Sequence, residues 1–546
     1  MRKELASRYA SFNLRVLIGL VVFFSGVLLA LFATAKPKPL IHGGASRLDA
    51  QVRAPNGFPV TSSGAVQEEW VARYNGPDNS WDVAVAIAID GSGNVFVTGH
   101  SEGTNPDYAT IKYNSAGQEE WAARYDGPGK GVDLATAIAV DAEGNVYVTG
   151  ESRSEISFNY ATIKYNPTGE EQWVARSGLG TRAVALAIDN LGNVYVTGEG
   201  PGATHSDYVT IKYNPAGEEQ WVGRYHGPGV GSNDFAKAIA IDSSGNVYVT
   251  GQSAGAGTFE SDYATIKYNS QGQEQWVARY DGPGDFDDDA AKAIAIDSSG
   301  NVYVTGFSFG PGKYDYATIK YNPIGEEQWV ARYDGDLNDL ANAIAVDGSA
   351  NVYVTGVSER SGMDYATIKY DSAGQEQWVS RYHASRGLAN EAGAIAVDNS
   401  SNVYVTGFTD NPSGFVDYAT IKYDSVGKEQ WVAIYDGPGT NDDVPARIAV
   451  DSSENVYVTG RSFGLDGNFD YATIKYVQGP TPTATPAPTS TSTPTSTPTA
   501  TATPTATPTA TSTPTTTATP AASPTPRPTP IPGARPTPAP RPTPMP

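Results

Sequence analysis

Apolar residues alternate with small or polar ones along most of the chain, and this alternation predicts short β-strands. Its first full copy covers Val83–Asp90, Asn94–Gly99, Asp107–Tyr113 and Gln118–Tyr125, which we name strands A, B, C and D. The central part of strand A recurs eight times, starting at Ala86, Ala137, Ala185, Ala238, Ala293, Ala343, Ala394 and Arg447.

A tight turn is predicted between strands A and B. In the second copy, Asp141–Asn145 supplies side chains that bond to nearby backbone, and Gly144 accepts a positive φ. Ala350, Ser401 and Glu454 replace this glycine in three later copies. The uniformity of the hairpin across the repeats indicates a structural frame.

A tryptophan in strand D marks each repeat. Consecutive tryptophans lie about 50 residues apart, and a period of this length that holds only strand signals is typical of a propeller. The tryptophans are Trp70, Trp121, Trp173, Trp221, Trp276, Trp329, Trp378 and Trp431. We therefore predict an all-β fold, an eight-bladed β-propeller of four-stranded antiparallel blades.

The order of the strands predicts how the ring closes. The first D strand, Gln67–Tyr74, comes before any A strand, and the last C strand, Tyr471–Tyr476, has no D strand after it. Unless these two strands pair, an apolar edge stays open at each end of the repeats. We expect the N-terminal strand to complete the eighth blade.

Strands C and D carry a recurring lysine and a recurring glutamate. A four-residue turn at Asn114–Gly117 predicts that Lys112 lies opposite Glu119, and that Thr110 lies opposite Trp121. Such a pair of opposite charges would stabilise the outer part of each blade.

Two sets of aspartates also recur. The set before strand A comprises Asp82, Asp133, Asp234, Asp289, Asp339 and Asp443. The set that opens strand C comprises Asp107, Asp207, Asp262, Asp315, Asp364, Asp417 and Asp470. Hydrogen bonding to local backbone accounts for both sets, because Asn or Thr replaces Asp in some copies. A ring of calcium ligands is the alternative.

The N-terminus carries a targeting signal. Basic residues precede Val16–Ala35, an apolar run of about 20 residues that is long enough to cross a bilayer as a helix. Ala33-Thr34-Ala35 matches a cleavage site, so residues 1–35 are either a signal peptide or a membrane anchor. Either one exports the rest of the chain, which places the protein outside the cell or on its surface.

The remaining boundaries follow from composition. Residues 36–63 form a linker, residues 64–477 the propeller, and residues 478–546 a Pro/Thr-rich tail. We expect the tail to be disordered, because it cannot bury enough apolar area to fold. It is either a stalk that O-glycosylation can modify or an inert extension.

Charge and cysteine content exclude several functions. The chain of 546 residues has a formal net charge of −22, which argues against nucleic acid as a partner because phosphate binding requires a basic excess. It contains no cysteine, which excludes disulfides and thiolate metal sites. We expect a monomer that meets a membrane only through an uncleaved N-terminal segment.

The whole repeat resembles a known family. Ala-Ile-Ala-Val-Asp-x-x-Gly-Asn-Val-Tyr-Val-Thr-Gly, followed by Asp-Tyr-Ala-Thr-Ile-Lys-Tyr and Glu-x-Trp-Val-Ala-Arg-Tyr, resembles the bacterial beta-propeller repeat called SBBP, and it is similar to NHL repeats. The resemblance covers Gln67–Tyr476. It implies an extracytoplasmic propeller and supplies no catalytic residues.

The candidate ligand site is the face that carries the D–A and B–C loops, because these loops vary while the A–B and C–D turns do not. Its off-pattern residues are Trp81, His100, His205, His226 and His383. The histidines come from different repeats, so scattered surface histidine is the favoured interpretation.

Calcium is the one cofactor for which the sequence offers a candidate site. The loop of Asp285, Asp287, Asp288 and Asp289 is rich in oxygen ligands, although it lacks the Gly and the distal Glu of an EF-hand.

No catalytic motif is recognisable, so we favour a binding or scaffold module for a protein, glycan or cell-wall ligand. A propeller enzyme that acts on extracellular polysaccharide is the alternative, and a spacer without ligand is a third interpretation.

Overall fold

The computed structural model describes residues 66–154, 157–202, 205–229, 233–255, 260–284, 288–384 and 389–479. All the regular elements in these residues are β-strands. Across the same ranges, no helix of a length and apolarity suited to crossing a membrane is found. The predicted N-terminal helix, the linker and the tail from Pro480 onward lie outside the described residues.

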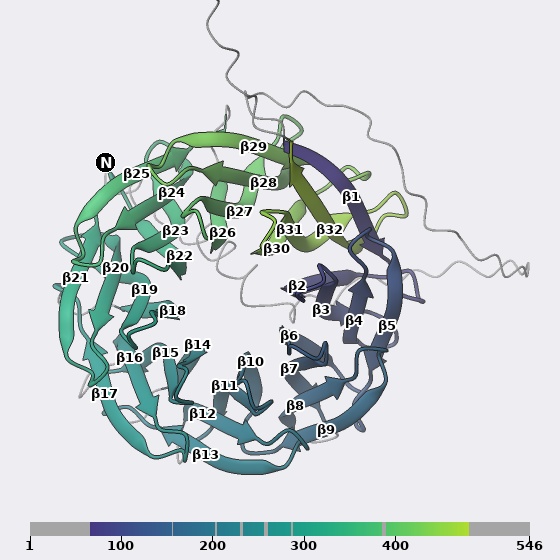
Figure 1. Ribbon diagram of the computed structural model, residues 1–546, viewed down its shortest axis with the longest axis horizontal. Coiled ribbons are helices and arrows are strands. Elements are labelled where there is room, and N and C mark those ends of the chain that lie inside the picture. Colours follow the sequence, from purple (N-terminus) through teal and green to yellow (C-terminus); the bar gives the residue numbers. More distant parts are fainter. Residues whose placement is uncertain are drawn as a thin grey trace, which may run out of the picture. The chain divides into compact units, whose positions relative to one another are not determined.

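Eight four-stranded antiparallel sheets stand around a common axis as the blades of a propeller (Figure 1). Blades 1 to 7 each use four consecutive strands, from β2–β5 in blade 1 to β26–β29 in blade 7. Blade 8 combines β30, β31 and β32 with β1 at its outer edge. The predicted eight-bladed fold and its closure by the N-terminal strand are both confirmed.

Each blade runs outward from strand A to strand D. The A strands are β2 (Asp82–Ile89), β6 (Asp133–Val140), β10 (Arg182–Ile188), β14 (Asp234–Ile241), β18 (Ala290–Ile296), β22 (Asp339–Val346), β26 (Asn390–Val397) and β30 (Asp443–Val450). The B strands are β3 (Val95–Ser101), β7 (Val146–Arg153), β11 (Val194–Pro201), β15 (Val247–Ala254), β19 (Val302–Phe309), β23 (Val352–Glu359), β27 (Val403–Asp410) and β31 (Val456–Phe463). The C strands are β4 (Asp107–Tyr113), β8 (Phe158–Tyr165), β12 (Ser206–Tyr213), β16 (Ser261–Tyr268), β20 (Tyr314–Tyr321), β24 (Met363–Tyr370), β28 (Val416–Tyr423) and β32 (Phe469–Gln478). The D strands are β5 (Glu119–Tyr125), β9 (Glu171–Ser177), β13 (Glu219–Tyr225), β17 (Glu274–Tyr280), β21 (Glu327–Tyr333), β25 (Glu376–Tyr382), β29 (Glu429–Tyr435) and β1 (Val66–Tyr74).

The A–B turn forms as its sequence predicts. Asp141 Oδ1 accepts hydrogen bonds from the backbone N–H groups of Glu143 and Asn145, at 3.1 and 2.8 Å, and Gly144 has a φ of 81°. The other carboxylate oxygen accepts the Tyr147 hydroxyl at 2.9 Å, which ties the turn to strand B. This turn therefore closes on itself and leaves little polar capacity for a ligand.

The core lies between blades, where apolar side chains of one sheet pack against the next. Strand B has neighbours on both of its faces, which explains its continuous Val-Tyr-Val run. The strand-D tryptophan bridges two blades: the Trp70 ring lies 6.2 Å from Tyr457 in blade 8 and 6.4 Å from Tyr113 in blade 1. Gly117, in the C–D turn of blade 1, fits beneath this ring, because a Cβ there would come within 2.5 Å of it.

The predicted register between strands C and D is wrong, because both predicted partners lie two residues further along strand D. Lys112 lies opposite Trp121, while Tyr113 lies opposite Glu119, because a β-bulge follows the turn. The Lys112 ammonium instead pairs with Glu120 at 2.9 Å and donates to the Pro167 carbonyl of blade 2 at 3.3 Å.

Thr110 does not lie opposite Trp121, as predicted, but opposite Ala123. Its hydroxyl lies 3.0 Å from that of Thr98 in strand B, and both residues are buried. The equivalent threonine pair occurs in all eight blades.

The aspartates that open strand A accept local backbone hydrogen bonds, as predicted. Asp133 Oδ2, for example, accepts the N–H of Gly127 at 2.8 Å. The aspartates that open strand C do something else. Asp107 pairs with Arg124 of strand D at 3.0 Å, and the same pair with the strand-D arginine forms at five of the seven positions. Asp207 and Asp417 instead contact His226 and Asn411.

Candidate functional site

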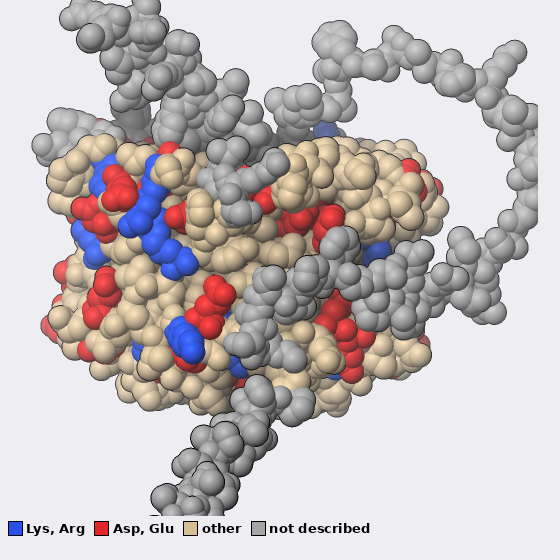
Figure 2. All heavy atoms as spheres, turned by 90° about the horizontal axis from the view of Figure 1, so that it is seen from above, with Lys and Arg blue, Asp and Glu red and all other residues tan. Residues whose placement is uncertain are grey.

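The D–A and B–C loops meet on one face of the ring, as their strand connections require. In blade 1, the N–H of Glu102 in the B–C loop donates to the carbonyl of Trp81 in the D–A loop at 2.8 Å. The space-filling view shows acidic and basic side chains in small separate groups on the side of the molecule turned toward the reader (Figure 2).

Trp81 is exposed at the seam between blades 8 and 1. Its side chain is 51% exposed, and the ring meets Phe469 edge-on at a centroid distance of 5.5 Å. Phe469 also contacts Phe463 at 5.1 Å and lies 5.0 Å from the guanidinium of Arg461. At the seam, Trp81 is thus the exposed ring, and it rests on the buried Phe469.

The four candidate histidines occupy different positions. His100 lies on β3 and not in a loop, where burial and the charge of Arg461 lower its pKa to about 4. His205 is exposed in the B–C loop of blade 3. His226 and His383 follow strand D, and their Nδ1 atoms lie 3.1 and 2.6 Å from Asp207 and Asp364. Their positions give no sign of a common site for the four.

The predicted calcium loop is only partly described. Asp285 and Asp287 lie outside the described residues. Asp288 Oδ1 accepts the N–H of Ser261 at 2.9 Å. Asp289 is 2% exposed, and its two oxygens accept the N–H groups of Gly282 and Phe309 at 2.5 and 2.9 Å. These two aspartates therefore hold the loop ends to neighbouring backbone.

Acidic groups gather where the chain passes from one blade to the next. At four junctions, a residue that opens strand C, one that follows strand D and one that opens the next strand A each offer a ligand atom within 4.8 Å of the others. The groups are Asp107, Asp126 and Asp133 at junction 1/2, Asp207, His226 and Asp234 at junction 3/4, Asp315, Asp334 and Asp339 at junction 5/6, and Asp417, Asp436 and Asp443 at junction 7/8.

Lysine and arginine pair with the groups at two of the four junctions. At junction 5/6, the strand-D residue Arg332 pairs with Asp315 at 2.8 Å, and Lys313 pairs with Asp334. Junction 1/2 has the same arrangement, since Lys130 pairs with Asp126 at 2.6 Å. Three carboxylates that lie so close would otherwise repel one another strongly.

Junction 7/8 departs from this arrangement. Ile434 occupies the position of the strand-D arginine and is 48% exposed. Burial, together with the charges of Asp436, Asp443 and Asp442, raises the pKa of Asp417 to about 7, although a hydrogen bond from Asn411 acts in the opposite direction. Negative charge is thus crowded here.

A second set of charged side chains projects from strands A and B near the axis, and we call it the axial set. Its members are Arg182, Glu199, Lys237, Lys292 and Glu391. Burial, with repulsion from Lys292 and Arg182, lowers the pKa of Lys237 to about 8 despite the attraction of Glu199. Lys292 and Glu391 interact although they come from blades 5 and 7, so their side chains extend toward the axis.

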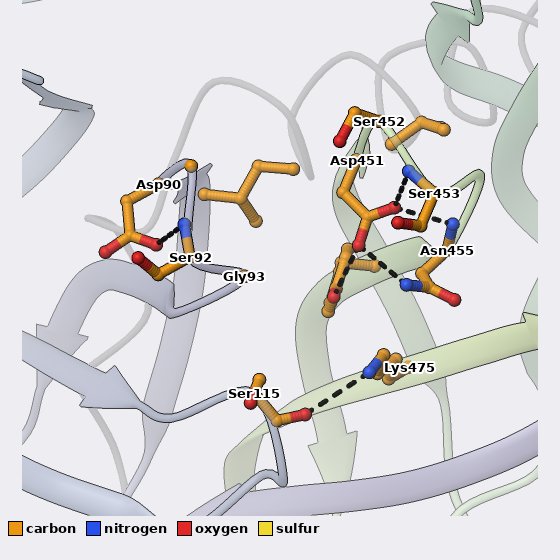
Figure 3. A pocket seen from close by; sticks show the side chains of 13 residues that line it. Asp90, Ser92, Gly93, Ser115, Asp451, Ser452, Ser453, Asn455 and Lys475 are labelled. Atoms are coloured by element: carbon orange, nitrogen blue, oxygen red, sulfur yellow. Dashed lines mark hydrogen bonds between the residues drawn. The ribbon is translucent and has the colours of Figure 1, made fainter.

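One cavity of about 440 Å³ opens on the opposite face, between the A–B turns of blades 8 and 1. Asp451 lines it, but its oxygens accept hydrogen bonds from Ser453 and Asn455 (Figure 3). The Lys475 ammonium donates to the Ser115 carbonyl at 3.2 Å. The polar groups of this cavity thus serve the turns that line it.

Sequence reasoning missed both the junction groups and the axial set. It treated the two aspartate sets separately and overlooked the third position, after strand D, where Asp126, Asp334 and Asp436 align with His226. It also looked for variation only in loops. A comparison of equivalent positions inside strands A and B would have singled out Lys237.

Two stretches, residues 222–257 and 430–466, match the family model described as SBBP, beta-propeller repeat. The predicted resemblance to this repeat is confirmed. The comparison with curated proteins gives no match.

Solved structures with a similar fold share little sequence with this chain. Sqt1 from Chaetomium thermophilum aligns at 10% identity and a TM-score of 0.49, over 76% of this chain and 98% of its own. The periplasmic gluconolactonase PpgL of Pseudomonas aeruginosa aligns at 11% identity and a TM-score of 0.42, over 67% and 98%. The polysaccharide lyase Uly1 aligns at 10% identity and a TM-score of 0.39, over 72% and 89%. Similarity of this order carries no inference about activity.

Proposed function

We propose that the protein is an exported, surface-associated propeller that binds a protein, glycan or cell-wall ligand through its D–A and B–C loop face. The observation that carries this proposal is the distribution of differences among the repeats. The A–B turns, the strand-D tryptophans and the threonine pairs are nearly uniform, whereas Trp81 and the axial set break the pattern. Variation on a rigid scaffold is how repeat folds make binding surfaces.

The aromatic surface at the seam is the strongest single feature of this face. Trp81 is half-exposed and packs edge-on against the buried Phe469, so it offers a fixed aromatic ring with a polar N–H. Such a combination suits a ligand that has both apolar faces and hydroxyl or carboxylate groups.

The full-length chain, offered to a glycan array, to cell-wall fragments and to surface extracts, tests the proposal. We expect a ligand whose binding falls at least tenfold in Trp81→Ala and stays unchanged in Ser453→Ala, a control on the opposite face. Binding that survives Trp81→Ala but falls in Ser453→Ala would place the ligand on the wrong face. Release of new reducing ends from a polysaccharide would favour the enzyme instead.

A further inference from the structure

Arg447 stands on the innermost strand of blade 8, at a position where every other blade carries alanine. Strand A forms the inner edge of each sheet, and Arg447 lies in the middle of β30, opposite Thr459 of strand B. The residues opposite the equivalent threonines in blades 1 to 7 are Ala86, Ala137, Ala185, Ala238, Ala293, Ala343 and Ala394. A long cationic side chain therefore replaces a methyl group beside the axis of the ring.

The guanidinium of Arg447 has no carboxylate partner among the described residues. Its hydrogen bond in that part of the chain runs from Nη1 to the carbonyl of the preceding residue, Ala446, at 2.8 Å. The surrounding protein lowers the pKa of Arg447, and yet its side chain is exposed to water. Both observations hold for a side chain that stands in a water-filled passage with protein around it. From the middle of an innermost strand, that passage is the axis of the ring.

Two further cations come from the strands A of blades 4 and 5. Lys237 and Lys292 each occupy the β-bulge of their strand, one residue before the alanine position. Their ammonium groups lie 5.2 Å from the Phe235 ring and 5.1 Å from the Phe307 ring, and they repel each other. The bulge residues of the other six blades carry no charge: they are Val85, Thr136, Val184, Asn342, Gly393 and Ala446.

These cations face one another across the ring. In a ring of eight blades, blade 4 lies across the axis from blade 8 (Figure 1). Lys237 and Arg447 occupy successive positions of strand A, so they lie at nearly the same level. Glu199 and Glu391 attract Lys237 and Lys292, but burial alone shifts the pKa of Arg447. Positive charge thus borders the axis on two sides, in a chain whose formal net charge is −22.

We propose that the axis of the ring binds a small polyvalent oxyanion, a polycarboxylate or a polyphosphate, between Arg447 on one side and Lys237 and Lys292 on the other. A guanidinium matches two oxygens of a carboxylate or phosphate at once, and the ammonium groups add point charges. Low-dielectric walls around the axis strengthen the field of these cations. A monovalent anion reaches only one wall, and Glu199 and Glu391 repel it, so a ligand with several acidic groups fits better. This inference does not depend on the proposed ligand of the loop face.

Calorimetric titration of the full-length chain with citrate and with pyrophosphate, at constant ionic strength, tests the proposal. We expect one site per chain for at least one probe, and a melting temperature that rises with the concentration of that probe. Tighter binding of citrate would identify a carboxylate ligand, and tighter binding of pyrophosphate a phosphate ligand. Arg447→Ala restores the residue of the other seven blades, so it should fold, and it should weaken binding at least tenfold. Lys237→Val introduces the residue that Val184 supplies in blade 3 and should also weaken binding.

Lys428→Gln is the matched control for the loss of one positive charge. Lys428 is exposed in the C–D turn of blade 7, in the outer part of the ring, and equivalent turns carry glutamine at Gln118, Gln273 and Gln375. This variant should bind the probes as the wild type does. The proposal would be overturned if neither probe bound the wild type, or if Arg447→Ala kept wild-type affinity. An equal loss in Lys428→Gln, or an equal response to acetate at the same ionic strength, would also overturn it, because either result would indicate a general effect of charge.

Discussion

Trp70 is the side chain whose removal tests how the ring is closed. It lies on β1, which pairs with β32 from Val66 opposite Gln478 to Tyr74 opposite Tyr471. Its ring packs between Tyr113 and Tyr457, and its Nε1 donates to the Ser115 carbonyl at 3.2 Å. Trp70→Ala should cost about 3–5 kcal/mol for the lost burial, and roughly 0.5–1.5 kcal/mol more for the hydrogen bond.

Trp221→Ala is the matched control, because Trp221 occupies the same position in blade 3. Its Nε1 donates to the Ser270 carbonyl at 3.2 Å, and its ring lies 6.1 Å from Tyr195 and 5.9 Å from Tyr268. The strand that carries it follows strand C directly in the chain, whereas β1 reaches β32 only through space. The two variants should lose similar stability in urea unfolding followed by circular dichroism.

The two variants should differ in how often β1 separates from β32. In Trp70→Ala, β1 loses its main anchor, so the β32 amides that bond to β1 should exchange with solvent two to three orders of magnitude faster. In Trp221→Ala those amides should keep the wild-type rate. Hydrogen exchange read by mass spectrometry over Phe469–Gln478 measures this directly. Equal protection of that segment in both variants would contradict the expectation that loss of Trp70 lets β1 open locally.

Three other predictions concern buried or half-buried polar groups. The pKa of His100 is lowered to about 4 from an ordinary 6.5, so the folded protein loses stability as the pH falls from 6.5 toward 4. His100→Gln should remove this loss of at most about 3 kcal/mol, which melting curves across that pH range would measure. The pKa of Lys237 is lowered to about 8, so its positive charge opposes folding at pH 7. Lys237→Met should therefore raise the melting temperature at pH 7 more than near pH 10, and an equal rise at the two pH values would contradict this. The hydroxyls of Thr305 and Thr318 lie 2.9 Å apart, so Thr305→Val should cost about 1–3 kcal/mol by leaving Thr318 without this hydrogen bond. Changing both residues to Val should cost less than the single change, and additive losses in urea unfolding would contradict a coupled pair.

The fold was predictable because its signals are local and repeated. Asp141 and Gly144 specify a turn within a few residues, and eight copies of that turn made the blade count robust. The closure of the ring followed from counting strands. The register of Lys112 was missed because a β-bulge depends on how strand D twists against strand C, and no residue type marks it in advance.

The junction groups were missed for a different reason. Asp417, Asp436 and Asp443 belong to three strand ends in two blades, and only the packing of those blades brings them together. Junction 7/8 differs from junctions 1/2 and 5/6 because Ile434 stands where their D strands carry an arginine. A search for functional side chains passes over such a position.

The pairing of Val66 with Gln478 has a mechanical consequence. The chain enters and leaves the ring at neighbouring points on one end of the same strand pair. A force applied between the two ends of the propeller would load the β1–β32 hydrogen bonds one after another, as in a zipper, and not all together in shear. The ring would then open between β1 and β32 under modest tension while blades 1 to 7 stayed intact.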